Sequence, residues 1–92
     1  MSNKKTILIT GSSRGIGRAV AELAYDQGYD VIVHGMTDSK ELLEIHAKLK
    51  GSRKLIFDIS DKKAVDDNLK DIKVDVLVNN AGIARNFMSS LD

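Results

Sequence analysis

The sequence contains no cysteine, no tryptophan and no long apolar run, and these absences exclude several classes of protein. Without cysteine the chain has neither a disulfide framework nor a thiolate metal site. Aromatic residues are only 4% of the chain, so the core must be aliphatic. No apolar stretch approaches the roughly 18 residues that cross a membrane, and no signal-peptide pattern precedes the first apolar segment. We therefore expect a cytoplasmic chain with no membrane partner.

The net charge is also close to zero. The 14 Lys and Arg residues and the 13 Asp and Glu residues leave a formal charge of +1, so no strong field favours nucleic acid or an anionic membrane. Hydrophobic residues are 42% and charged residues 29%, a balance typical of folded globular chains. A chain of 92 residues has room for one domain at most.

Short apolar runs alternate along the chain with stretches of helical periodicity. The runs suit strands that are buried on both faces, as in a parallel sheet. They cover Thr6–Thr10, Val31–Val33, Lys54–Phe57 and Val74–Val78. After residues 79–82, which read as a polar turn, the segment 83–92 has no clear pattern, and a loop and the start of another helix both remain open.

Three helices are expected between these strands. The first follows a glycine-rich turn and runs to about Asp26, before Gly28. The second begins with a capping box of Asp38 and Glu41 and ends at Gly51, and the third is capped by Ser60 or Asp61. The residues expected to face inward are Ile16, Ala19, Val20, Leu23 and Ala24 in the first helix, Leu42, Ile45, His46 and Leu49 in the second, and Val65, Leu69 and Ile72 in the third.

This β-α-β-α-β-α-β alternation predicts an α/β fold. Helices of this length between strands imply parallel pairing with right-handed crossovers. The natural packing is a partial Rossmann-type doubly wound sheet with strand order 3-2-1-4.

The strongest chemical signal is the segment 10–17, Thr-Gly-Ser-Ser-Arg-Gly-Ile-Gly, which we call the glycine turn. It follows a buried strand and opens a helix, the context in which such a motif binds phosphate. Gly11 permits a tight turn, Gly15 lets a pyrophosphate approach the backbone, and Gly17 lets the helix lie close to the sheet. The helix N-terminus favours an anion, and the hydroxyls of Ser12 and Ser13 are further candidate donors. A P-loop is excluded because no Gly-Lys-Ser/Thr ending follows, whereas a turn without ligand remains the plain alternative.

The spacing G-x-x-x-G-x-G, with Asp58 after the third strand and Asn79-Asn80-Ala81-Gly82 after the fourth, is similar to the short-chain dehydrogenase/reductase family. Residues 10–19 look most like its 3-oxoacyl-[acyl-carrier-protein] reductase branch. The resemblance implies that the pyrophosphate and the adenosine ribose lie against Gly11, Ser13, Arg14, Ile16 and Gly17. It implies that Asp58 accepts from the adenine amino group beside Ile59, and that Asn79, Ala81 and Gly82 follow the ribose and nicotinamide half.

Several of these residues also have a plainer interpretation. Asp58 stands where an aspartate commonly begins a turn. Asn79 and Asn80 are equally suited to satisfying buried backbone groups. We interpret His34 as a strand-end residue near the adenosine ribose and His46 as a packing residue, neither of them catalytic.

The cofactor is expected to be NADP(H), with NAD(H) possible. NAD-selective Rossmann proteins place an Asp or Glu after the second strand, where this chain has residues 34–37 with no carboxylate. Arg14 in the glycine turn is able to pair with a 2′-phosphate. Asp38 is the complication, since it can swing toward the ribose, but we assign it to the helix cap.

Catalysis in the family depends on a Ser and a Tyr-x-x-x-Lys pair, which the resemblance places beyond the fourth strand. The only tyrosines here are Tyr25 and Tyr29, and neither has a Lys four residues later. We therefore assign no catalytic residue, Asn86 included, and no metal site. We expect residues 1–92 to be the dinucleotide-binding half of a Rossmann-fold reductase, inactive without the catalytic half.

The resemblance implies a carbonyl substrate, plausibly an acyl thioester of fatty acid biosynthesis, and a homo-oligomer. Without neighbouring strands, residues 74–78 would form an exposed apolar edge. The main alternative function is a non-catalytic nucleotide-binding or interaction module. A flavodoxin-like regulatory domain is disfavoured, because it needs acidic residues where the first strand ends in Thr10-Gly11-Ser12.

Overall fold

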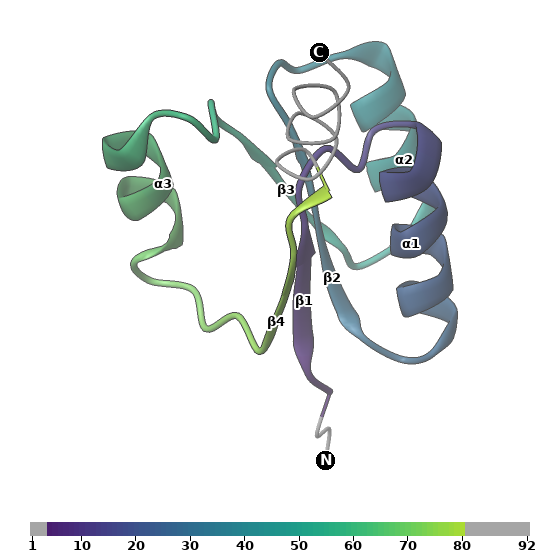
Figure 1. Cartoon of the computed structure of the whole chain (residues 1–92). Helices are drawn as coiled ribbons and strands as arrows, with labels where there is room; N and C mark the ends of the chain where they lie inside the picture. Colours follow the sequence, from purple (N-terminus) through teal and green to yellow (C-terminus); the bar gives the residue numbers. More distant parts are fainter. Residues whose placement is uncertain (1–3, 81–92) are drawn as a thin grey trace, which may run out of the picture.

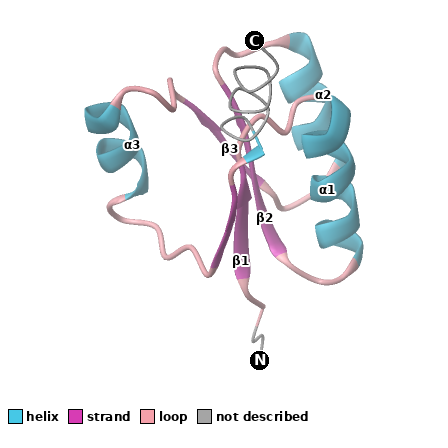
Figure 2. Cartoon of the chain, in the orientation of Figure 1, coloured by secondary structure: helices cyan, strands magenta, loops and turns pink. Residues whose placement is uncertain are grey.

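A computed structural model of the chain describes residues 4–80 and shows the predicted alternation of strands and helices (Figure 2). Ala81, Gly82, Asn86 and the tail 83–92 lie outside the described residues. The elements, in chain order, are β1 (Thr6–Ile9), α1 (Gly15–Asp26), β2 (Asp30–Gly35), α2 (Lys40–Lys48), β3 (Arg53–Ile56), α3 (Lys62–Leu69) and β4 (Val76–Val78).

The four strands of the described residues form one parallel sheet in the order β3-β2-β1-β4, which confirms the predicted topology. β1 lies inside the sheet, since Ile9 pairs with Val33 of β2 on one side and with Val78 of β4 on the other. α1 and α2 cover one face and α3 lies on the other (Figure 1). All the carboxyl ends therefore meet at one edge, the edge where ligands bind in doubly wound folds.

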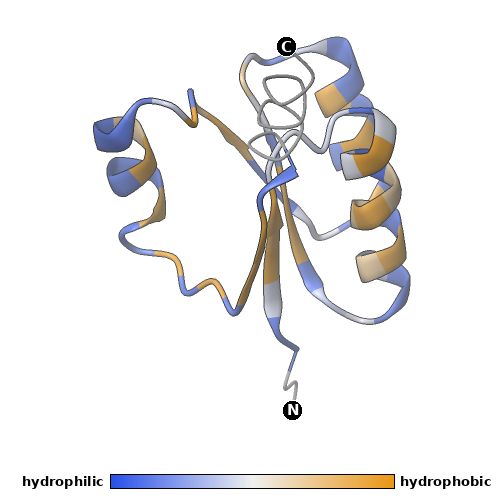
Figure 3. Cartoon of the chain, viewed as in Figure 1, coloured by the Kyte–Doolittle hydropathy of each residue, from blue (hydrophilic) through white to orange (hydrophobic). Residues whose placement is uncertain are grey.

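The main core fills the space between the sheet and the pair α1 and α2. Alternate residues of neighbouring strands point into it, as Ile7 and Ile9 of β1 do, while Leu8 and Ile32 are buried on the opposite face. Figure 3 shows the apolar colouring concentrated on the strands. The buried members of the cluster are Ile7, Ile9, Ala21, Ala24, Val31, Val33, Leu42, Ile45 and Leu49. The core is aliphatic, as the composition requires.

The predicted inward face of α1 is wrong in part: Ala24 is buried and Val20 packs against the core, but Ala19 is exposed. Ile16 and Leu23 are 77% and 61% exposed, and the buried residues of this helix are Gly17, Ala21 and Ala24. Their spacing of four and three residues places them on one side of the helix. The helix packs on the sheet through its smallest residues, because only these allow the backbone of α1 to come so close.

The predicted capping box at the start of α2 is also wrong. Ser39, not Asp38, is the N-cap, and its Oγ accepts a hydrogen bond from the Leu42 N–H at 3.1 Å. The Asp38 carboxylate is instead paired with Lys54 Nζ at 3.1 Å. For α3 the Asp61 alternative is confirmed, since its carboxylate accepts from the Ala64 N–H at 3.2 Å.

α3 and β4, the last helix and strand of the described chain, are largely exposed. α3 contains no fully buried residue, and the predicted inward residues Val65, Leu69 and Ile72 are only half-buried. β4 is an edge strand of the described sheet, as β3 is at the other side, and Leu77 is 58% exposed although its register partner Leu8 is buried. The predicted exposed apolar edge is confirmed. In the described part of the chain, no helix has the length and apolarity needed to cross a membrane.

Candidate functional site

The glycine turn leaves β1 and opens α1 with a backbone that only glycine adopts readily. Gly11 and Gly15 have φ angles of +64° and +65°, in the left-handed region that is costly for other residues. The N-cap of α1 is Arg14, whose side chain makes no capping hydrogen bond. α2 and α3 both have side-chain caps, so α1 alone among the helices of residues 4–80 begins with its N–H groups uncapped and with no acidic residue in its first turn.

Gly17 lies where α1 comes close to Gly11, after β1, and to Asn80, after β4. A Cβ added there would collide with the Gly11 carbonyl oxygen and would lie 2.7 Å from Asn80 Nδ2. This geometry supports the predicted role of Gly17 in close packing. The glycine turn, the start of α1 and the end of β4 thus meet at one crowded point.

Ser12 does not have the role that its position suggested. Its side chain is fully buried, and its Oγ accepts a hydrogen bond from the His34 N–H at 2.8 Å. Its own N–H donates to the His34 carbonyl at 2.9 Å. The hydroxyl therefore ties the glycine turn to β2 and does not face a phosphate. Ser13 is half-buried and lines the cavity described below.

His34 is the residue whose importance the sequence did not reveal. Its ring is fully buried against the glycine turn, and its predicted place near a ribose stays a prediction. Nδ1 accepts a hydrogen bond from the Gly11 N–H at 3.0 Å, and Nε2 lies 2.8 Å from the Phe57 carbonyl oxygen. The ring also packs on that of Phe57, with the centroids 4.4 Å apart. Burial lowers the pKa of His34 below its usual 6.5, and the hydrogen bond to Phe57 opposes this shift.

The end of β4 braces the glycine turn from the other side. Asn80 Nδ2 donates to the Gly11 carbonyl at 3.1 Å, and Thr10 Oγ1 donates to Asn79 Oδ1 at 3.2 Å. The interpretation in which these asparagines satisfy backbone and side-chain groups of the sheet is therefore observed for Asn80. The cofactor contact of Asn79 stays a prediction.

Asp58, after β3, forms the turn that its plainer interpretation foresaw. Its Oδ1 accepts from the Ser60 N–H at 2.9 Å and from the Ser60 hydroxyl at 2.7 Å. The adjacent Ile59 is half-buried. The adenine contact of both residues stays a prediction.

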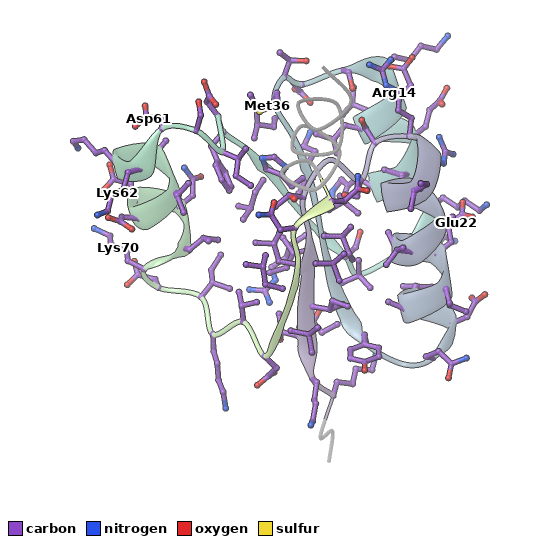
Figure 4. The ribbon with its side chains drawn as sticks, in the orientation of Figure 1. Arg14, Glu22, Met36, Asp61, Lys62 and Lys70 are labelled. Carbon is purple, nitrogen blue, oxygen red and sulfur yellow. The ribbon has the colours of Figure 1, made fainter. Side chains whose placement is uncertain are left out.

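A cavity of about 480 Å³ opens at the carboxyl ends of β1 and β2, within the size range of small-molecule sites. Arg14 and Met36 both lie at this end of the molecule (Figure 4). The cavity is lined by Gly11, Ser13, Arg14, Gly35, Met36, Thr37, Ser39, Glu41 and Asn80. The structure thus brings together three of the predicted site residues, Gly11, Ser13 and Arg14, in the lining of this cavity. The other five described ones lie outside the lining: Ile16, Gly17, Asp58, Ile59 and Asn79. A hollow of about 410 Å³ at the amino end of the sheet is lined by Lys4, Lys5, Gln27, Gly28 and Tyr29 and lacks such a turn.

The wall of the cavity beyond β2 consists of Gly35, Met36 and Thr37 and carries no carboxylate. Asp38 is held by Lys54. The carboxylate that does line the cavity is Glu41, in the first turn of α2. The sequence pattern does not predict this placement, because it indicates for Glu41 a capping box that does not form.

The chain belongs to the short chain dehydrogenase family, whose family model matches residues 5–92. It is 42% identical over 87 residues to a 3-oxoacyl-[acyl-carrier-protein] reductase of Haemophilus influenzae, a match that covers 88% of this chain and 36% of the relative. It is 41% identical over 86 residues to an uncharacterised oxidoreductase of Schizosaccharomyces pombe, covering 88% of this chain and 28% of that protein.

Solved structures agree with this assignment. A short-chain dehydrogenase from Streptomyces avermitilis has a TM-score of 0.76 at 34% identity, over 87% of this chain and 32% of that one. A second, from Bacillus anthracis, has a TM-score of 0.75 at 25% identity, over 83% of this chain and 35% of that one. The chain therefore spans about a third of the length of the proteins that it matches.

Proposed function

We propose that this chain supplies the dinucleotide-binding part of an NAD(P)-dependent oxidoreductase. The observation that carries the proposal is the uncapped N-terminus of α1, whose N-cap residue Arg14 lines the cavity below the glycine turn. Unpaired N–H groups and the positive end of a helix dipole stabilise a phosphate. At the starts of α2 and α3 a side-chain cap already accepts from one of these groups, the N–H of Leu42 and that of Ala64.

The residues present fit a pyrophosphate. Gly11, Ser13 and Arg14 border the cavity, Gly17 keeps the helix close behind it, and Ile16 projects from the first turn with 77% of its surface exposed. We propose that these five residues hold the pyrophosphate and the adenosine ribose. By the same family pattern, Asp58 and Ile59 take the adenine, and Asn79, with Ala81 and Gly82, takes the nicotinamide half.

Within this site we propose NADP(H) as the preferred cofactor. Arg14 is exposed and lines the same cavity as Thr37 and Ser39, so a 2′-phosphate there has a cation and two hydroxyls within the lining. Asp38, the carboxylate between the lining residues Thr37 and Ser39 in the sequence, is paired with Lys54. Glu41 also lines the cavity and opposes this preference, which makes it a matter for direct measurement.

When bound, the nicotinamide exchanges a hydride with a carbonyl substrate. Similarity to the 3-oxoacyl reductase suggests an acyl thioester and a role in fatty acid biosynthesis in the cytoplasm. We assign none of the residues described here to catalysis. Tyr25 donates its hydroxyl to the Lys50 carbonyl at 2.8 Å, and Tyr29 packs against the core, so both tyrosines have structural roles.

The test is a fluorescence titration of the purified chain with NADPH and with NADH. We expect tighter binding of NADPH, and we expect Arg14→Gln to weaken NADPH about tenfold or more while changing NADH little, because a charge-assisted contact to the 2′-phosphate is lost. Arg18→Gln is the matched control, one helical turn away and engaged by Glu22 and Glu44. Equal or tighter NADH binding would reject the NADP(H) preference, and no binding of either at millimolar concentration would reject the function.

A further inference from the structure

We propose that His34 is a positioning residue of the dinucleotide site, which holds the Gly11 amide as a neutral imidazole and releases the glycine turn when it is protonated. Dinucleotide binding by this chain is then weakened in mild acid through a group that never touches the ligand. The inference rests on the proposed function and adds a regulatory property to the same site.

The two ring contacts define one protonation state. The Gly11 N–H is a donor, so Nδ1, 3.0 Å away, must be an unprotonated acceptor. The Phe57 carbonyl is an acceptor, so Nε2, 2.8 Å away, must carry the proton. Only the neutral Nε2–H tautomer satisfies both partners. One imidazole thereby joins the glycine turn to the carboxyl ends of β2 and β3.

A second proton on the His34 ring is incompatible with this arrangement. On Nδ1 it would set an N–H donor against the Gly11 N–H donor, and the amide would lose its acceptor. The ring cannot swing away, since it is fully buried and packed on Phe57 at 4.4 Å. Hydrogen bonds of Ser12 also fix the backbone of His34 on both its N–H and its carbonyl. Protonation must therefore displace the turn at Gly11, the residue that borders the cavity.

The charged groups on the neighbouring segments do not offset this effect. Arg14 of the turn and Asp58 after β3 are exposed, Glu41 at the start of α2 is half-buried, and the end of β4 contributes the neutral Asn79 and Asn80. Within residues 4–80, the influences on the pKa of His34 are burial and the Phe57 carbonyl, with no ionised side chain among them. Burial favours the neutral form, so the turn is held at neutral pH and released below it.

The first test is nuclear magnetic resonance of the intact chain without ligand. The ¹⁵N shifts of the His34 ring should report a protonated Nε2 and an unprotonated Nδ1 at pH 8. The Gly11 amide resonance should move with the titration of His34. An Nδ1–H tautomer, or a Gly11 amide that does not respond while His34 titrates, overturns the proposal.

The second test is NADPH affinity from pH 8 to pH 5.5, in variants with matched side chains. His34→Asn keeps an acceptor at the position of Nδ1 but cannot be protonated, and His34→Leu has no acceptor. His46→Asn is the control, because His46 is the only other histidine and its Nδ1 lies 3.2 Å from the hydroxyl of Ser52, a residue between α2 and β3 that is not part of the glycine turn. The 2′-phosphate of NADPH also titrates in this range. Because it does so equally for every protein, its effect cancels in the ratio of the wild-type affinity to that of each variant at the same pH.

We expect the wild type and His46→Asn to lose affinity by up to about tenfold per pH unit below the pKa of His34. His34→Asn should bind with little of this pH dependence, and His34→Leu should bind weakly throughout. An unchanged pH dependence in His34→Asn overturns the inference. If the wild type binds no dinucleotide at any pH, the proposed function has failed, and the resonance of the Gly11 amide alone decides whether His34 holds the turn. If the variants do not fold, the Gly11 amide resonance of the wild-type chain likewise decides whether His34 holds the turn.

Discussion

Replacing Gly17 with alanine should destabilise the chain, although alanine is the better helix former. At an unconstrained helical position the change is worth about 1 kcal/mol in favour of alanine. Here the new Cβ would collide with the Gly11 carbonyl oxygen and lie 2.7 Å from Asn80 Nδ2. The first obstacle is backbone within a fixed turn, so it cannot move aside as the end of a flexible side chain would.

Two costs oppose the helix propensity. Overpacking of a close contact costs about 1–3 kcal/mol. Displacing Asn80 also breaks its hydrogen bond to the Gly11 carbonyl, 3.1 Å in the native chain, which is worth about 1 kcal/mol. The net expectation is a loss of about 2 kcal/mol in the free energy of unfolding. With a slope of about 1.5 kcal/mol per M, the urea midpoint falls by about 1.3 M.

The assay is urea denaturation followed by circular dichroism, with Ala19→Gly as the reference. Ala19 is exposed on the same helix, so its replacement measures the propensity difference in α1 without the steric term. Because the two substitutions run in opposite directions, the sum of their destabilisations cancels the propensity difference and gives the cost of the contact. A Gly17→Ala variant as stable as the wild type, or more stable, would refute the argument that α1 meets the sheet through an unyielding backbone contact.

Two further predictions concern Gly15 and His34. Gly15 and Gly28 have φ angles of +65° and +93°, and an added Cβ meets nothing within 4 Å at either. Gly15→Ala and Gly28→Ala should therefore each lower the free energy of unfolding by about 1–2 kcal/mol through backbone strain. Only Gly15→Ala should also weaken NADPH binding, by about tenfold, and equal affinities of the two variants would contradict the proposed dinucleotide site at the glycine turn. Because burial holds the pKa of His34 below 6.5, the unfolded chain takes up the proton first, so the free energy of unfolding should be constant above about pH 6.5 and fall by up to about 1.4 kcal/mol per unit below it. The pKa of Glu22 is also lowered, mainly by its hydrogen bond with Lys48, but from 4.5, so its effect belongs to a more acid range; a His34→Asn chain with the same decline between pH 6.5 and 5 would contradict this assignment.

The topology was predictable because it follows from local patterns and a chirality rule. Four β-branched runs separated by helical segments imply parallel pairing, and right-handed crossovers then restrict the order to few choices. The glycine turn was predictable for the same reason, since its residues act where they stand in the chain. What they do there depends on backbone geometry that glycine alone reaches readily.

The inward face of α1 was predicted only in part, because a close contact with the sheet favours small residues over the more hydrophobic ones. Ile16 and Leu23 are the more apolar residues, yet they are exposed, while the small residues Gly17, Ala21 and Ala24 are buried. The signal was present as a stripe of small side chains at spacings of four and three. A close helix–sheet contact selects for size before hydrophobicity.

The cap of α2 was missed because Asp38 and Ser39 are both common N-cap residues, and only the structure shows that Ser39 caps the helix while Asp38 pairs with Lys54 on β3. The role of His34 was missed because its ring partners are distant in the sequence. His34 lies 23 residues from each of its ring partners, Gly11 and Phe57. Neither pairing is visible until the register of the strands is known. A histidine that ends an otherwise apolar strand is the one local feature that hinted at a buried role.

The dinucleotide site is therefore not a property of the glycine turn alone. Gly11 is held by His34 through its N–H and by Asn80 through its carbonyl, and Asn80 is 69 residues away. The turn reaches its final geometry only after β2 and β4 have joined β1. A ligand that binds this geometry and not the unfolded chain stabilises the whole sheet in proportion to its affinity. Binding and folding of this chain are consequently coupled. NADPH should raise the urea midpoint of the wild type more than that of a variant in which His34 or Asn80 no longer holds Gly11.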